Sequence, residues 1–135
     1  MAWIEPVTNR TLDDVLARNE LGVLNASDLN RIDGNMQELA NNLGVTIAPA
    51  KNWTNSSIPV VSDYERIIDS TKAVRSALKV PEPMPEVPAM PLNSFDKYNA
   101  IEKIQLMLYT QYRLLQDAKI FAGDGYYSGD KIGVI

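Results

Sequence analysis

The side chains of this sequence that could do chemistry are carboxylates, lysines and tyrosines, because the chain contains no histidine and no cysteine. Those absences exclude Ser-His and Cys-His nucleophile pairs, cysteine-ligated zinc and iron–sulfur clusters, and they remove the usual general base at neutral pH. A glycosidase could still act with two carboxylates that face each other across a cleft. The acidic residues fall mostly at the starts and on the polar faces of predicted helices, so we expect that the chain is not an enzyme.

Three short motifs resemble binding sites but lack the full pattern of one. Asp13-Asp14 fits the first turn of a helix, where the helix dipole favours negative charge. Asp124 and Asp130 lie among glycines, without the alternating carboxylates of an EF-hand loop. The Gly-Asp-Gly sequence at 123–125 lacks the strand and helix that flank a nucleotide-binding loop. We therefore expect no metal ion and no cofactor.

The composition is typical of a single globular domain: 135 residues, of which 45% are hydrophobic and 22% charged. The net charge of -4 does not favour binding to nucleic acid or to an anionic membrane surface. No apolar run approaches the roughly 18 residues of a membrane span, and the N-terminus lacks the pattern of a signal peptide. We expect a soluble protein made in the cytoplasm, with neither nucleic acid nor membrane as a partner.

Apolar residues at steps of three and four predict three main amphipathic helices, over residues 26–43, 61–78 and 94–118. The first has Asn25 as its N-cap and Gly44 after its last apolar residue, where a left-handed cap residue belongs. The third is apolar around much of its circumference, which indicates either deep burial or contact with a partner.

Two further segments accompany these helices. Residues 11–19 predict a short helix with Thr11 as its N-cap. Its apolar residues, which we expect to face the core, are Leu12, Val15 and Leu16. Residues 81–91 hold five of the eight prolines and predict a stiff, extended crossover that runs the length of a helix. The alternative is that these prolines dock into an aromatic groove of another protein.

An internal repeat relates the predicted helices. Residues 27–32 and 62–67 share four identities in six at an offset of 35, and a weaker third copy begins at Tyr98. A period of this length is typical of helical repeats, although a compact three-helix bundle fits equally well. We expect five structural anchors: Trp3, Ile32, Trp53, Ile67 and Ile101.

Two arginines, Arg31 and Arg66, occupy equivalent positions in this repeat. Each could pair with the acid three residues earlier on its own helix, which is Asp28 in one copy and Asp63 in the other. Alternatively, the two arginines join adjacent repeats to each other. The sequence leaves both interpretations open.

These patterns together predict an all-α fold, with the three main helices in a small bundle, an internal repeat of about 35 residues and a long Pro-rich crossover. Residues 1–120 form the helical domain, which includes the short N-terminal helix. Residues 121–135 are rich in glycine and tyrosine, and they predict an irregular or short β segment that serves for interaction.

Tyrosines are the best candidates for a recognition surface, because tyrosine offers a large contact area at a low entropic cost. For the two that fall on the third helix, a place in the core is the alternative. The C-terminal segment must dock on its own core, pair with another subunit or stay mobile, because its glycines disfavour a stable local helix. The candidate interface residues are Tyr109, Tyr112, Tyr126, Tyr127, Ile132, Val134 and Ile135.

Several blocks of the sequence, in this order, resemble a known family. They are Trp-Ile-Glu-Pro at 3–6, Asn-Ala-Ser-Asp-Leu-Asn-Arg-Ile-Asp at 25–33, Asn-Trp-Thr at 52–54 and Tyr-Ser-Gly-Asp at 127–130. Between them, the segments at 58–64, 74–78 and 99–102 continue the match. The blocks are similar to those of tail-region proteins of phages and prophages of Firmicutes, over nearly the whole chain.

The resemblance implies a non-enzymatic structural component of the virion, located in the distal tail or baseplate. It implies other phage tail or baseplate proteins as partners, together with self-association, and a path from the host cytoplasm during assembly to the virion tail. The alternative function is a module that recognises carbohydrate or protein on the host surface through aromatic residues of the C-terminal region.

Overall fold

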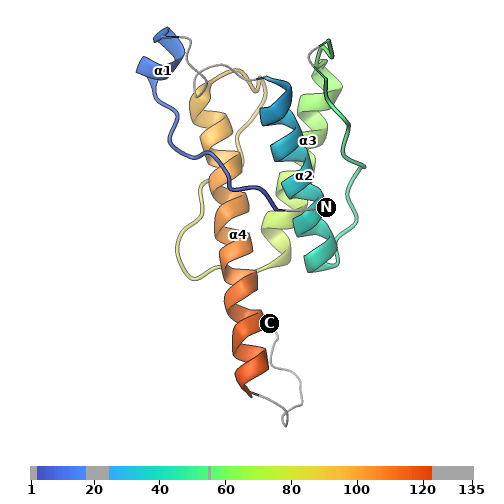
Figure 1. The fold of residues 1–135 in the computed structure, drawn as a ribbon, viewed down its shortest axis with the longest axis vertical. Helices are drawn as coiled ribbons and strands as arrows, with labels where there is room; N and C mark the ends of the chain where they lie inside the picture. Colours follow the sequence, from blue (N-terminus) through green and yellow to red (C-terminus); the bar gives the residue numbers. More distant parts are fainter. Residues whose placement is uncertain (1–2, 18–24, 55, 123–135) are drawn as a thin grey trace.

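The computed structural model describes residues 3–17, 25–54 and 56–122, and these residues form an all-α fold without strands (Figure 1). The short helix α1 spans Leu12–Ala17. The three main helices are α2 (Ala26–Leu43), α3 (Val61–Ala77) and α4 (Phe95–Ala122), and they pack together as a small bundle. The predicted fold class is therefore confirmed for this part of the chain.

Most helix boundaries follow the predictions, and the largest difference is at the end of α4. The predicted third helix ends at residue 118, whereas α4 continues to Ala122, because neither glycine nor proline occurs before Gly123. Phe121 and Ala122, which the sequence assigns to the C-terminal segment, thus belong to the last turn of a helix. Residues 123–135 lie outside the described residues, and with them five candidate interface residues: Tyr126, Tyr127, Ile132, Val134 and Ile135.

The helix ends form where the sequence predicts caps. The Asn25 side chain accepts a hydrogen bond from the Asp28 N–H (3.1 Å), and the Asp28 carboxylate accepts one from the Asn25 N–H (3.0 Å), which completes a capping box. Gly44 ends α2 with φ 71° and ψ 30°, the left-handed conformation that glycine adopts without steric cost. At α1, the Thr11 hydroxyl accepts a hydrogen bond from the Asp14 N–H (3.2 Å).

The three main helices run parallel to one another. Arg31 in the second turn of α2 is bonded to Glu102 in the second turn of α4, and Arg66 near the start of α3 is bonded to Asp33 of α2. Partners at the same depth in each helix require that all three helices begin at the same end of the bundle (Figure 1). The chain must therefore return along the length of the bundle before each new helix can start.

Three extended segments make these returns, and each lies over the junction, or seam, between two helices (Figure 1). Residues 3–10 cover the first seam, between α4 and α2. Residues 45–54 and 56–59 cover the second seam, between α2 and α3, and the Pro-rich residues 79–93 cover the third, between α3 and α4. The repeat that the sequence reveals thus contains an extended covering segment and a main helix, and in the first copy α1 lies between the two.

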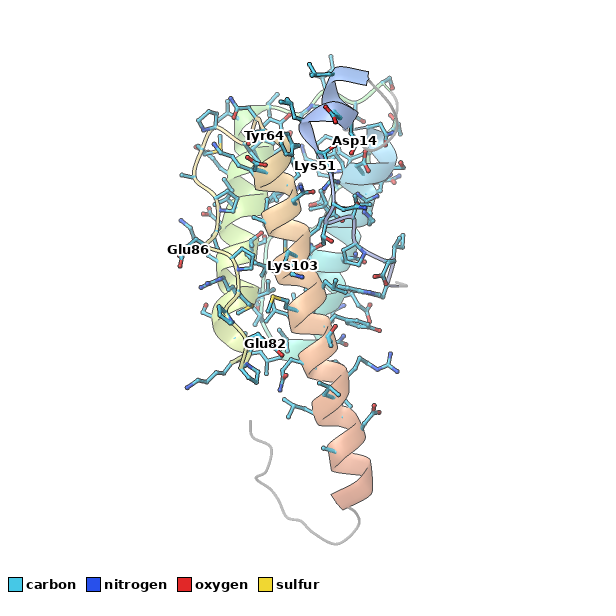
Figure 2. All side chains as sticks on the ribbon, turned by 90° about the vertical axis from the view of Figure 1, so that its left-hand side faces the viewer. Asp14, Lys51, Tyr64, Glu82, Glu86 and Lys103 are labelled. Carbon is cyan, nitrogen blue, oxygen red and sulfur yellow. The ribbon has the colours of Figure 1, made fainter. Side chains whose placement is uncertain are left out.

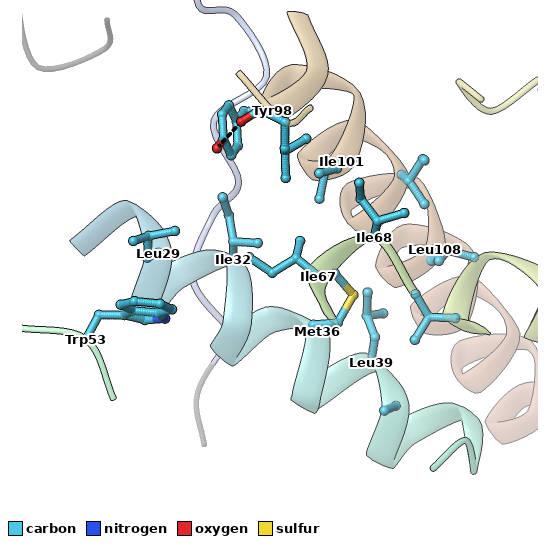
Figure 3. Packing of buried hydrophobic residues seen from close by; sticks show 14 residues of the cluster. Leu29, Ile32, Met36, Leu39, Trp53, Ile67, Ile68, Tyr98, Ile101 and Leu108 are labelled. Atoms are coloured by element: carbon cyan, nitrogen blue, oxygen red, sulfur yellow. Dashed lines mark hydrogen bonds between the residues drawn. The ribbon is translucent and has the colours of Figure 1, made fainter. Parts of the chain in front are cut away.

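The core lies on the axis between the three helices (Figure 3). Equivalent isoleucines of the three repeats occupy its centre, since Ile32, Ile67 and Ile101 are 0%, 1% and 0% exposed. Trp53 enters this core from the second covering segment and is 5% exposed. The other buried hydrophobic residues are Leu29, Met36, Leu39, Ala40, Ile68, Val74, Leu92, Tyr98, Ile104 and Leu108.

Helix α1 does not contribute to this core, contrary to the prediction. Leu12 is 58% exposed and Leu16 is 71% exposed, so the expectation that they face inward is wrong; the Val15 side chain lies outside the described residues. The reason is that residues 3–10 already fill the seam between α4 and α2, which leaves no groove for the helix that follows them. Helix α1 instead projects at the end of the bundle where the main helices begin (Figure 1).

Candidate functional site

The first seam is fastened by a buried ionic cluster around Glu102, whose side chain is fully buried. The carboxylate accepts hydrogen bonds from the guanidinium groups of Arg10 (2.6 Å) and Arg31 (2.7 and 2.8 Å) and from the Val7 N–H (3.1 Å). Burial lowers the pKa of Arg31, but its bonds and charge interactions with Glu102 and Asp28 outweigh this effect and leave the pKa raised. Glu102 therefore binds two permanent positive charges and the backbone of the first covering segment.

The second seam has a corresponding cluster around Asp33. Both oxygens of this carboxylate accept hydrogen bonds from the Arg66 guanidinium, at 2.8 and 2.9 Å. The same carboxylate accepts the indole N–H of Trp53 at 2.6 Å. The bidentate pair with Asp33 raises the pKa of Arg66 despite its partial burial, so the guanidinium remains charged.

Arg31 fits both interpretations of the repeated arginines, whereas Arg66 fits only the one in which the arginine joins adjacent repeats. Arg31 bonds both to Asp28 on its own helix (2.9 Å) and to Glu102 across the first seam. Arg66 pairs with Asp33 across the second seam, and the acid on its own helix, Asp63, instead pairs with Lys51. Both arginines therefore join adjacent repeats.

Asp63, the equivalent of Asp28 in the second repeat, pairs with Lys51 of the second covering segment. The hydrogen bond from Lys51 and the one from the Val60 N–H hold the pKa of Asp63 below its ordinary value. Its contribution to stability is therefore present above the ordinary pKa of an aspartate and is lost as the pH falls through the lowered value. Lys51 is largely exposed, so solvent screens this pair and limits its strength.

Asparagine side chains hold the covering segments by their backbones. The Asn99 amide accepts a hydrogen bond from the Arg10 N–H (3.1 Å) and donates one to the Arg10 carbonyl (2.9 Å). Asn30, at the equivalent position of α2, makes the same pair of bonds with Trp53, at 2.8 and 2.9 Å. Asn35 binds the backbone of Ile4 in the same way, at 2.9 and 2.6 Å. Sequence reasoning missed these clamps, although asparagines two residues before Ile32 and Ile101 were a visible signal.

The buried carboxylates described above act as structural anions. A general base or nucleophile needs a carboxylate that faces a cleft with free hydrogen-bonding capacity, whereas Glu102 and Asp33 are each bonded to guanidinium groups inside the protein. Across residues 3–17, 25–54 and 56–122, no three acidic side chains lie close enough together to hold a metal ion. The ion pairs of Glu102 and Asp33 fasten the bundle at its first two seams.

Two of the predicted interface tyrosines, Tyr109 and Tyr112, lie on α4 and are half-buried. The Tyr109 ring stacks on Trp3, with ring centroids 3.9 Å apart and planes 9° from parallel. The Tyr109 hydroxyl also accepts a hydrogen bond from the exposed Arg113 (3.2 Å). One face of Tyr109 thus serves to fix the start of the first covering segment.

Exposed apolar side chains lie on two separate elements at the end of the bundle where the main helices begin. We name five of them the apolar rim; they are Leu12, Leu16, Ile58, Val60 and Val61. Ile58 is the most exposed, at 82%. Two of the five lie on α1, and the other three lie at the first residue of α3 or just before it, on the other side of the same end of the bundle (Figure 1). The sequence signal for the second group is the run Ile-Pro-Val-Val at 58–61, which the analysis of helical stripes did not use.

The opposite end of the bundle is marked by the length of α4. Because Ile32 and Ile101 are equivalent, the last residue of α2, Leu43, lies level with Tyr112. From there α4 extends beyond the other described helices to Ala122, which at 1.5 Å per residue is roughly 15 Å (Figure 1). Leu114 in this extension is 57% exposed.

None of the helices in the described part of the chain is long and apolar enough to cross a membrane. No protein-family model matches the chain. A search of curated proteins and a search of solved structures likewise yield no significant match. The geometry of the seams, the apolar rim and the sequence resemblance are therefore the basis for a functional proposal.

Proposed function

We propose that this chain is a non-enzymatic structural protein of a phage or prophage tail or baseplate, in which it acts as a protein–protein assembly module. The observation that carries the proposal is the apolar rim. The core of the bundle is closed without these residues, so they are free to contact a partner. Exposed apolar groups on two elements at one end of the bundle offer contacts to a partner that covers this end.

The fastening of the seams supports the same role. Two buried ionic clusters and three asparagine clamps hold the covering segments, so that residues distant in sequence form one rigid body. A rigid body with a preformed contact surface loses little conformational entropy when it assembles. The buried carboxylates, in turn, are bonded to arginines, which favours a structural rather than a catalytic role.

The sequence blocks at 3–6, 25–33 and 52–54 supply the connection to phage tails. In the structure, these blocks hold the parts that define the fold: Trp3 stacks on Tyr109, Asn25 caps α2, and Trp53 bonds to Asp33. The family resemblance therefore rests on residues with clear structural roles. Its implied partners are other tail or baseplate proteins and further copies of this chain.

We expect that acidic residues on the apolar rim block assembly without unfolding the protein. Leu16→Glu and Ile58→Glu place a charge where a partner would cover an apolar side chain, and both positions are solvent-exposed in the chain itself. Thermal unfolding should shift by no more than about 2 °C, because exposed substitutions usually change stability by less than about 0.5 kcal/mol. The readout is the amount of chain in purified tail particles, measured by quantitative mass spectrometry.

Leu114→Glu is the matched control, since this exposed leucine lies at the opposite end of the bundle. The double rim variant should fall to a small fraction of the wild-type amount in particles, whereas the control should be retained. A wild-type chain that is absent from purified particles would contradict the structural role. Binding of the isolated protein to host cell walls, undiminished by the rim substitutions, would favour the host-recognition alternative instead.

A truncation tests the contribution of the C-terminal segment. Deleting residues 123–135 leaves every described helix complete, so the far-UV circular dichroism per molecule should remain that of a helical protein. We expect weaker self-association, measured by analytical ultracentrifugation, or reduced incorporation into particles. Unchanged assembly would show that this segment is dispensable, and loss of helical signal would show that it supports the core.

A further inference from the structure

The three seams follow one plan, which makes a difference in the third seam visible. In the first two seams, an asparagine two residues before the central isoleucine clamps the covering segment: Asn99 in the first and Asn30 in the second. In both seams, the arginine that precedes the central isoleucine of one helix also pairs with the acid that follows the central isoleucine of the neighbouring helix. These pairs are Arg31 with Glu102 and Arg66 with Asp33.

The third seam lacks each of these fasteners. At the three equivalent positions, Glu65 stands in place of the clamping asparagine, Ile68 in place of the acid and Ala100 in place of the arginine. Among the described residues, no hydrogen bond joins Glu65 to the covering segment. Side-chain hydrogen bonds to this segment come from Arg75, at the carbonyls of residues 84 and 85, and from the hydroxyl of Tyr98 and the ammonium of Lys97, at those of residues 92 and 91. None of them is made at residues 86–90, beside Glu65 and Ile68.

A hollow lies at the point where the fasteners are missing. It has a volume of about 370 Å³ and lies between α3 and the covering segment, with Glu65, Ile68 and Asp69 on one side and residues 87–90 on the other. In the other two seams, the equivalent place is filled by a large planar side chain of the covering segment: Arg10 or Trp53. The third segment has Val87 there, at the same offset of 34 that relates Ile67 to Ile101.

The charges at the hollow favour an arginine over a tryptophan as its occupant. Glu65 and Asp69 lie one helical turn apart, both are exposed, and neither has an ion pair within the part of the chain that the structure describes. Lys72 also lines the hollow, while Glu86 lies on the exposed side of the neighbouring segment (Figure 2). The net charge around the hollow is negative, and its floor is the buried side chain of Ile68.

We propose that this hollow binds an arginine side chain that an extended segment of a partner protein presents. The aliphatic part of the arginine packs on Ile68 and Met90, and the guanidinium binds the carboxylates of Glu65 and Asp69. The first seam shows the same solution inside the chain, where Arg10 on an extended backbone reaches Glu102. The site is separate from the apolar rim, and it would exist whether or not the chain belongs to a phage tail.

The test is a titration of the full, isotope-labelled chain with N-acetyl-arginine methylamide, followed by amide NMR shifts. We expect saturable shifts confined to residues 65–72 and 87–90. N-acetyl-citrulline methylamide has the same shape without the charge, and its affinity should be lower by a factor of at least about 5. The double variant Glu65→Gln/Asp69→Asn should lose binding to the same extent, whereas Glu38→Gln on α2 should not.

A second variant tests the geometry. Val87→Trp supplies a large planar side chain at the position that corresponds to Trp53, so it should fill the hollow and abolish the arginine-dependent shifts without lowering the melting temperature. Equal binding of arginine and citrulline, shifts spread over other surfaces, or undiminished binding by the Val87→Trp protein would overturn the proposal. Tighter binding of N-acetyl-tryptophan methylamide than of the arginine probe would also overturn it. If Val87→Trp does not fold, the Glu65/Asp69 variant decides.

Discussion

Replacing Glu102 by glutamine should lower the free energy of unfolding by about 3–5 kcal/mol, because it removes the carboxylate that two buried guanidinium groups share and leaves Arg10 without an ionic partner among the described residues. The side chains of Arg10 and Arg31 are only 5% and 10% exposed, so water cannot replace the lost carboxylate. The loss also weakens the hold on the first covering segment, whose Val7 N–H bonds to the same carboxylate. Urea unfolding followed by circular dichroism measures the change.

Glu86→Gln is the matched control, since Glu86 is exposed on the third covering segment and makes no ion pair among the described residues. It should change the stability by less than about 0.5 kcal/mol. Replacing Arg10, Arg31 and Glu102 together by methionines should restore much of the lost stability, because buried ion pairs often stabilise no more than apolar residues of similar size. A Glu102→Gln protein within about 1 kcal/mol of wild type would refute the structural importance of this charge.

Substituting alanine at Ile32, Ile67 or Ile101 should cost about 2–5 kcal/mol in each case, and the three costs should be similar. All three side chains lie at the centre of the core and are at most 1% exposed, so each substitution leaves a cavity with the same kind of lining. Similar costs are expected only if the three repeats are structurally equivalent. Thermal and urea unfolding of the three variants provide the comparison.

Ile58→Ala is the control for this series, because it removes the same atoms from a side chain that is 82% exposed. It should change the free energy of unfolding by less than about 0.5 kcal/mol. If one of the three core variants has the same urea midpoint of unfolding as the wild type while the others are strongly destabilised, the three repeats are not structurally equivalent. Such a result would identify the helix that packs least tightly.

The sequence alone determined the local structure of this protein. The apolar stripes, the Asn25 cap and Gly44 predicted α2 with its observed bounds, because the signals for a helix and its ends lie within a few residues of each other. The offset of 35 between residues 27–32 and 62–67 revealed repeated units for the same reason. The excess of prolines likewise predicted an extended crossover before α4.

Only the tertiary structure decided how these units face one another. The parallel direction of the helices and the order around the bundle put Arg66 beside Asp33, which is 33 residues away, although Asp63 is nearer in sequence. The same packing turned α1 outward and left a hollow between α3 and the third covering segment. Such contacts depend on which helix meets which groove, and that choice is made by burial of the whole core rather than by any local pattern.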